Sequence, residues 1–174
     1  MKNISAIIAS LVFATLPVSN VMAADEGIYG LLSAGVTPVT GSVSTTFSLG
    51  LSLGGGYNFN KHVGVEGQYG LLGMATSNTL NAQVLAITIN GYLPVQEQFN
   101  VFVKAGKSYT TVTDGKPDAS VSQSAMKNVY GCGLEFSSDN QKKYRLGVDH
   151  YDLSSAPGMS LSTNYINLTV VTNF

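Results

Sequence analysis

Large apolar side chains alternate with small or polar ones along residues 47–59, FSLGLSLGGGYNF. This period of two predicts an extended strand, because successive side chains of a strand point to opposite faces. A soluble sheet usually places charged residues on its outer face. The chain from Gly27 to Asn60, however, contains no Asp, Glu, Lys or Arg. The pattern therefore indicates that something other than water contacts the large side chains.

The same alternation recurs along the chain and predicts eight strands of about ten residues, the length that a tilted strand needs to cross a bilayer. The predicted strands cover residues 27–36, 47–59, 63–71, 84–93, 99–106, 129–136, 143–151 and 165–174. The first is less regular than the others, because Leu31 shares a face with Tyr29 and Ser33. Charges within the strand cores fall on the face of the small residues: Glu66, Lys104, Glu135, Arg145 and Asp149.

This distribution predicts that the large apolar side chains face lipid and that the small and charged ones face the inside of a cylinder. The cylinder has to close, since an unpaired strand edge in hydrocarbon leaves its N–H and C=O groups without partners. The expected fold class is all-β, an eight-stranded antiparallel up-and-down transmembrane β-barrel. A soluble β-sandwich is the alternative.

The connections between the predicted strands alternate between two lengths. Short turns are expected at 60–61, 94–98 and 137–142, and longer segments rich in Ser, Thr, Gly and Asn at 37–46, 73–82, 111–127 and 153–163. This is the pattern of short periplasmic turns and longer external loops. Aromatic residues should form a girdle near the short turns: Tyr57, Phe59, Phe99, Phe136, Tyr144 and Phe174. A thinner set would mark the other interface: Phe47, Tyr69 and Tyr109.

The N-terminus has the layout of a secretory signal peptide. Lys2 precedes the apolar stretch 4–16, and Val21-Met22-Ala23 fits the small-residue rule for cleavage between Ala23 and Ala24. The apolar stretch is too short to span a bilayer. We therefore expect a signal peptide over 1–23 and a barrel domain over 24–174, with a buried N-terminal helix as the alternative.

The composition of the remaining 174 − 23 = 151 residues suits one domain with a single core. Removal of Lys2 leaves 8 basic and 10 acidic residues, a net charge near −2, and no basic run that would bind nucleic acid. The single cysteine, Cys132, excludes an intramolecular disulfide. No segment of this part supplies the roughly 20 apolar residues of a membrane helix.

Residues 50–70, GLSLGGGYNFNKHVGVEGQYG, resemble the OmpA-like outer-membrane β-barrel family, as do the opening GIYGLLSAG and the last strand. The resemblance implies a place in the cell outer membrane, contact with its lipid and lipopolysaccharide, and handling by periplasmic chaperones and the barrel-insertion machinery. The insertion signal of the family matches apolar or terminal positions here: Ile166, Leu168, Val170, Thr172 and Phe174. The peptidoglycan-binding domain of some relatives is not expected in this protein.

In OmpA-like barrels, inward carboxylates and cations pair across the lumen, and Glu66, Lys104, Glu135 and Arg145 occupy similar places here. A further cation of the family falls near Asn90. Buried charges must be paired, so we expect Glu66–Arg145 and Lys104–Glu135, or the swapped pairs. Because an eight-stranded barrel is just wide enough for side chains to fill, the network should plug the lumen. A gated narrow pore is the alternative.

Other candidate sites are weaker. Gly54-Gly55-Gly56 lies inside a strand and lacks the Lys and Ser/Thr of a phosphate loop. His150 on the predicted lipid face resembles the catalytic histidine of lipid A 3-O-deacylase barrels. The position two residues later, a serine in those enzymes, is Asp152 here, and Ser154 would lie about 13 Å along the strand. His62 has no partner at metal-binding spacing.

Lys107 departs from the charge pattern, because strict alternation places it on the lipid face. Either its side chain reaches the outer interface, or a bulge near Gly106 shifts the register.

Together these observations predict a non-enzymatic outer-membrane barrel without cofactor or metal, with a role in envelope integrity or in adhesion through its external loops. The segment 111–127 has the charges to hold a host-surface or matrix ligand: Asp114, Lys116, Asp118 and Lys127. A narrow porin-like channel and a lipid A-modifying enzyme are the alternatives.

Overall fold

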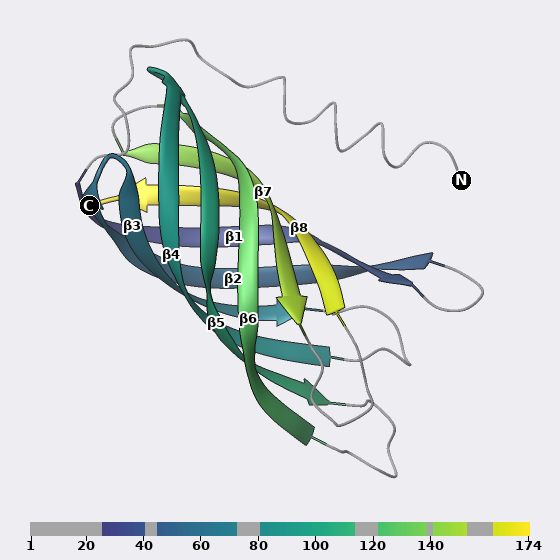
Figure 1. The fold of residues 1–174 in the computed structure, drawn as a ribbon. Helices are drawn as coiled ribbons and strands as arrows, with labels where there is room; N and C mark the ends of the chain where they lie inside the picture. The colour runs from purple at the N-terminus through teal and green to yellow at the C-terminus, as the bar shows by residue number, and fades with distance from the viewer. Residues whose placement is uncertain (1–25, 41–44, 73–80, 114–121, 139–140, 153–161) are drawn as a thin grey trace.

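Eight antiparallel strands close into a barrel in the computed structural model, in which each strand pairs with the next and β1 pairs with β8 (Figure 1). The structure describes residues 26–40, 45–72, 81–113, 122–138, 141–152 and 162–174. The strands are β1 (Gly27–Thr40), β2 (Thr45–Asn60), β3 (Val63–Leu72), β4 (Asn81–Gln96), β5 (Phe99–Thr113), β6 (Ser122–Ser137), β7 (Lys142–Asp152) and β8 (Ser162–Asn173). The predicted fold class is confirmed. The predicted signal peptide and its cleavage site lie outside the described residues.

Two hairpins are longer than the sequence pattern predicts. The β1–β2 ladder continues to Thr40↔Thr45, and the β5–β6 ladder continues to Thr113↔Ser122. The predicted loops 37–46 and 111–127 were therefore too long. Beyond the bilayer both faces of a strand meet water, so apolar residues no longer need to alternate with polar ones, and the period that reveals a strand disappears.

Pro94 lies in β4 rather than in the predicted turn 94–98. It is paired with Asn100, and the register with β5 shifts between Pro94 and Gln96. Proline is tolerated in a sheet at such an irregularity, because it has no N–H to donate to the ladder. The turn between β4 and β5 is thus shorter than expected.

The two faces of the strands have opposite environments, as the alternation predicts. In β2, Leu49 is 58% exposed and Ser48 is 1% exposed. In β4, Ile87 and Ile89 are exposed, whereas Ala86, Thr88 and Asn90 are buried. The apolar side chains cover the outside of the barrel, and the polar side chains fill its lumen. This inside-out distribution is the arrangement of a barrel that is surrounded by lipid.

Aromatic residues gather on the outside at the end of the barrel with the short turns. The Tyr57 and Phe59 rings lie 5.3 Å apart, and the Phe99 and Phe136 rings lie 4.9 Å apart. Phe174 ends the chain at the same rim, where its backbone N–H donates to the carbonyl of Ile28 at 3.1 Å. These positions agree with an aromatic girdle at one membrane interface. The described residues form no helix with the length and apolarity to cross a membrane.

Candidate functional site

The lumen is organised around Arg145, which β7 projects inward. The guanidinium donates from Nη1 to Glu66 Oε2 of β3 at 2.7 Å and from Nε to Glu135 Oε2 of β6 at 2.6 Å. Arg145, Glu66 and Glu135 are at most 4% exposed. A buried arginine is stabilised only when its attraction to carboxylates and its hydrogen bonds offset the loss of hydration. Here two carboxylates supply both.

Aromatic rings enclose the same guanidinium. Its Cζ lies 5.3 Å from the ring centre of Tyr29 and 5.5 Å from those of Tyr92 and Phe102. Nη2 donates to the Tyr92 hydroxyl at 2.9 Å. The faces of aromatic rings attract cations, so the rings stabilise the charge while excluding water from it. Sequence reasoning missed these three residues, although their place on the small-residue face of each strand was visible.

Lys104 of β5 extends the network toward β7. Its ammonium lies 2.9 Å from Asp149 Oδ2 and 3.8 Å from Glu66 Oε1. The ion pairs thus run in one chain, from Glu135 through Arg145, Glu66 and Lys104 to Asp149. Of the first expected set, Glu66–Arg145 is present, whereas Lys104–Glu135 is not among the ion pairs of the described residues. Both pairs of the swapped set, Glu66–Lys104 and Glu135–Arg145, are present, and Lys104 also pairs with Asp149.

Asn90, near which the resemblance to the OmpA-like family implied a further cation, also binds Glu66. Its amide nitrogen donates to Glu66 Oε2 at 3.1 Å and to the Tyr92 hydroxyl at 3.3 Å. The Tyr29 hydroxyl donates to the same Glu66 oxygen at 3.1 Å. Neutral donors therefore surround Glu66 beside its two cations. With Lys143 also buried in the lumen, three basic residues accompany three acidic ones among the described residues, so these buried charges balance.

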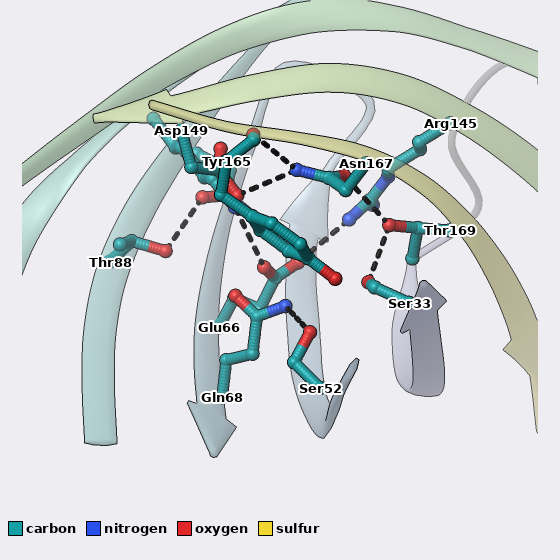
Figure 2. Close-up of polar contacts among 12 residues, drawn as sticks. Ser33, Ser52, Glu66, Gln68, Thr88, Arg145, Asp149, Tyr165, Asn167 and Thr169 are labelled. Carbon is teal, nitrogen blue, oxygen red and sulfur yellow. Dashed lines mark hydrogen bonds and ion pairs between the residues drawn. The ribbon is translucent and has the colours of Figure 1, made fainter. Parts of the chain in front are cut away.

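A chain of polar side chains links the network to β1 (Figure 2). Asn167 donates to Asp149 Oδ2 at 3.1 Å and accepts a hydrogen bond from Thr169 at 3.1 Å. Ser33 and Thr169 hydroxyls lie 2.5 Å apart, which joins β1 to β8 inside the lumen. On the neighbouring strands β2 and β3, Gln68 donates to Ser52 at 2.8 Å. The lumen is thereby cross-linked between strands that lie far apart in sequence.

Apolar side chains fill the lumen nearer the external loops. One cluster joins buried residues of β3, β4, β6, β7 and β8: Leu72, Ala82, Val84, Ala86, Val129, Tyr151 and Tyr165. Within it, the Tyr165 hydroxyl donates to the carbonyl of Gly50 at 3.1 Å. The lumen therefore has a charged layer near its middle. Closer to the external end it has a layer in which this apolar cluster packs beside buried hydroxyl side chains such as Ser108 and Thr110.

Glycines make room for the large lumen residues. A side chain at Gly56 would collide with the Tyr29 ring, and one at Gly133 would collide with Phe102 and with the carbonyl of Leu146. The Gly54–Gly56 run lies within β2, which continues directly into the turn before β3. Within the run, Gly56 leaves space for the Tyr29 ring. The run is part of a strand and has no phosphate-loop geometry.

Two side chains named from the sequence lie on the outside of the barrel. Lys107 is exposed, and the β4–β5 and β5–β6 ladders run through it without a register shift. Of the two alternatives, the bulge near Gly106 is therefore excluded, and Lys107 projects outward from the barrel. His150 stacks on Tyr130, with ring centres 4.7 Å apart, and its Nδ1 lies 2.8 Å from Asn164 Oδ1.

The remaining predicted positions are placed as follows. On β8, Ile166, Leu168 and Val170 face outward, followed by Thr172 and the exposed Phe174. His62 lies at the β2–β3 turn, where its Nδ1 is 3.3 Å from the Tyr92 carbonyl. Among the described residues no group of His, Cys, Asp and Glu could hold a metal ion. Asp114, Lys116 and Asp118 lie outside the described residues, as do Ala23 and Ala24.

Comparisons with solved structures show the same architecture at low sequence identity. Neisserial surface protein A superimposes with a TM-score of 0.73 at 12% identity, covering 85% of this chain and 97% of that chain. The N-terminal barrel domain of Pseudomonas aeruginosa OprF has a TM-score of 0.64 at 15% identity, covering 86% of this chain and 98% of that chain. Ail, the attachment invasion locus protein of Yersinia pestis, has a TM-score of 0.59 at 16% identity, covering 86% of this chain and 99% of that chain. These likenesses show the fold.

The family follows from the sequence itself. The model of the outer membrane protein beta-barrel domain matches residues 6–174, which is nearly the whole chain. No curated protein matches the chain by sequence. The chain belongs to the family of the outer membrane protein β-barrel domain and is a small β-barrel protein of the cell outer membrane.

Proposed function

We propose that this protein is a non-enzymatic structural barrel that supports envelope integrity and presents its external end for surface contact. The observation that carries the proposal is the filled lumen. Arg145 is held by two carboxylates and three aromatic rings, so the centre of the barrel is occupied by ordered side chains. The interior then serves stability rather than transport.

A conducting channel is the less favoured function. An ion that crossed the lumen would have to separate Arg145 from Glu66 or Glu135 and would also have to pass the packed layer around Val129 and Tyr165. Separating buried charges leaves uncompensated ions in a medium of low dielectric constant. Both layers therefore favour a closed barrel.

A lipid-modifying enzyme is also less favoured. His150 has an orienting partner in Asn164, which is one element of a nucleophilic site. The nucleophile is the missing element, because the position two residues after His150 carries Asp152 instead of a hydroxyl. Ser154 lies outside the described residues.

Surface contact is favoured by the external hairpins. From Ser122 to Asn128, β6 is paired with β5, while its pairing with β7 begins only at Val129. The paired ends of β5 and β6 therefore extend beyond the part of β6 that pairs with β7. Ail has been crystallised with the heparin analogue sucrose octasulfate. For the present protein we propose only the same class of partner, a ligand on a host surface or matrix.

Assembly is proposed to use the C-terminal residues. Phe174 is exposed at the periplasmic rim, at the end of the outward row Ile166, Leu168 and Val170. An extended terminal strand with apolar residues at every second position can add to an open sheet edge by strand pairing. The proposed partners are the barrel-insertion machinery, with periplasmic chaperones before it.

Two measurements test the proposal. Purified barrel in planar bilayers should give no steady conductance. Cells that carry the protein without residues 114–124 should adhere less to host cells or matrix. Deletion of 75–79 in another external connection is the control and should leave adhesion unchanged. Steady conductance of the intact protein would favour the channel. Unchanged adhesion after the 114–124 deletion would leave only the envelope role.

A further inference from the structure

Two polar pairs interrupt the apolar outside of the barrel on neighbouring strands. The Lys107 ammonium on β5 donates to Asn128 Oδ1 on β6 at 2.7 Å. His150 Nδ1 on β7 lies 2.8 Å from Asn164 Oδ1 on β8. Lys107, Asn128 and Asn164 are exposed on the outer surface, and His150 is partly exposed. Polar pairs on this surface need an explanation, because lipid is what surrounds it.

Tyr130 joins the two pairs into one band. It follows Asn128 by two residues on the same face of β6, and its ring stacks on His150 with an interplanar angle of 21°. The strand register places Lys107 opposite Asn128, Tyr130 opposite His150, and His150 opposite Asn164. We call this set the polar band: Lys107, Asn128, Tyr130, His150 and Asn164. It crosses β5 to β8.

The band lies toward the external rim. β6 begins at Ser122, β7 ends at Asp152 and β8 begins at Ser162, and these are the ends that the longer connections join. Tyr109, two residues beyond Lys107 along β5, is exposed on the same face. Tyrosine at such a place marks the membrane interface. Lys107 therefore lies just on the hydrocarbon side of the headgroups of the outer leaflet.

The wall formed by β2 to β4 is mostly apolar among its described residues, and the polar pair Tyr69–Gln83 on it carries no charge. On β2 and β4, the outward residues Leu49, Leu51, Leu85 and Ile87 are exposed and apolar. Ile87 is the direct register partner of Lys107. A lysine is unfavourable on the lipid face, and the penalty falls toward the interface, where a phosphate can pair with it. One wall of the barrel is thus built for ordinary lipid chains and the other also for a charged headgroup.

The band offers hydrogen-bond donors to such a headgroup. Lys107 keeps two ammonium protons after its bond to Asn128, and the amide NH₂ groups of Asn128 and Asn164 are further donors. The carboxylate of Asp152 at the rim would oppose an anion, but it lies 3.9 Å from the ammonium of Lys127. Positive charge and donors together fit a phosphate, and on this face the phosphate has to belong to a lipid.

We propose that the polar band binds a phosphate of the lipid A part of lipopolysaccharide in the outer leaflet, with Lys107 as its principal ligand. Lipid A is chosen over a phospholipid because the band lies at the external end, where the phosphorylated glycolipid forms the leaflet. The proposal requires only that the barrel spans the outer membrane. It does not depend on a role in adhesion or on whether the lumen conducts.

Native mass spectrometry of the folded barrel in zwitterionic detergent, titrated with lipid A, tests this directly. Lys107→Gln and Lys107→Met should bind lipid A about fivefold more weakly, which is the loss expected for one lysine at a charged membrane surface. Met is apolar and fits the lipid face, so the second variant keeps the barrel folded. Lys61→Gln, an exposed charge at the opposite rim, is the matched control and should bind like the wild type.

Two further ligands complete the experiment. Dephosphorylated lipid A should bind the wild type about as weakly as lipid A binds the Lys107 variants, and phosphatidylglycerol should bind more weakly than lipid A. Equal affinities of the Lys107 and Lys61 variants would overturn the proposal, as would equal binding of lipid A with and without phosphate. Phosphatidylglycerol binding as tightly as lipid A would overturn the choice of lipid.

Discussion

Arg145 on β7 and Glu66 on β3 meet inside the lumen with Nη1 2.7 Å from Oε2, although 79 residues separate them in the sequence. Glu135 of β6 holds the other side of the same guanidinium. The contact therefore ties three strands together at the centre of the barrel. Because all three groups are buried, the loss of one partner should have a large effect.

Replacement of Arg145 by Met should lower the free energy of unfolding by about 3–5 kcal/mol, the range for breaking a buried ion pair. The reason is that Glu66 and Glu135 stay buried without their shared cation. Urea unfolding in lipid vesicles measures the effect. Lys61→Met, which removes an exposed charge, should change the stability by less than about 1 kcal/mol. Equal effects of the two variants would contradict the account.

Removal of the arginine together with one carboxylate should be less harmful than removal of the arginine alone. The double variant Glu66→Gln, Arg145→Met keeps the buried charges in balance, with Lys104 and Lys143 against Glu135 and Asp149. Buried ion pairs are often replaceable by neutral groups of similar size, so the variant should recover part of the stability that Arg145→Met loses in the same urea assay. A double variant that is no more stable than Arg145→Met would show that charge imbalance is not the cause.

Gly133→Ala should destabilise the barrel by about 1–3 kcal/mol, the usual range for overpacking. An added Cβ would lie 2.8 Å from Phe102 Cε1 and would collide with the Leu146 carbonyl. Gly67→Ala is the matched control, because its Cβ would lie 4.0 Å from the nearest atom, the Gly55 carbonyl oxygen. The two variants are compared by the temperature at which each stops migrating on gels as a folded barrel. A Gly67 variant as unstable as the Gly133 variant would count against a crowded lumen.

Deletion of Phe174 should reduce the amount of folded barrel in the outer membrane several-fold. The residue ends the outward apolar row of β8, and its N–H bonds to Ile28 where β8 closes against β1. The heat-modifiable fraction in isolated outer membranes is the measurement. Phe47→Ala, which removes an exposed aromatic ring on β2, serves as the control and should assemble normally. Normal assembly without Phe174 would remove the proposed insertion signal.

Most of the fold could be predicted because lipid imposes a strict rule on each strand residue. Leu49, Ile87 and Leu168 follow the period of two, so the lipid face could be identified without any contact information. The rule ends where the strands leave the bilayer. The outer parts of β5 and β6, up to Thr113 and Ser122, could therefore not be distinguished from loop.

The candidate site could be predicted only in part. The alternation places Glu66, Lys104, Glu135, Arg145 and Asp149 in the lumen, but it does not give their partners. Pairing across a barrel depends on strand tilt and stagger, which determine which residues share a level. Lys104 therefore pairs with Asp149 of β7 instead of Glu135. The polar band could not be predicted either, because its residues come from four strands and meet only through the strand register.

The native cysteine provides the most direct test that lipid surrounds this barrel. Cys132 is exposed on β6 between its register partners Val103 and Val148, and it is the one cysteine of the chain. A nitroxide label on Cys132 of the barrel in lipid vesicles should be relaxed strongly by oxygen, which dissolves in hydrocarbon, and weakly by a water-soluble nickel chelate. Strong relaxation by the chelate and weak relaxation by oxygen would contradict the account.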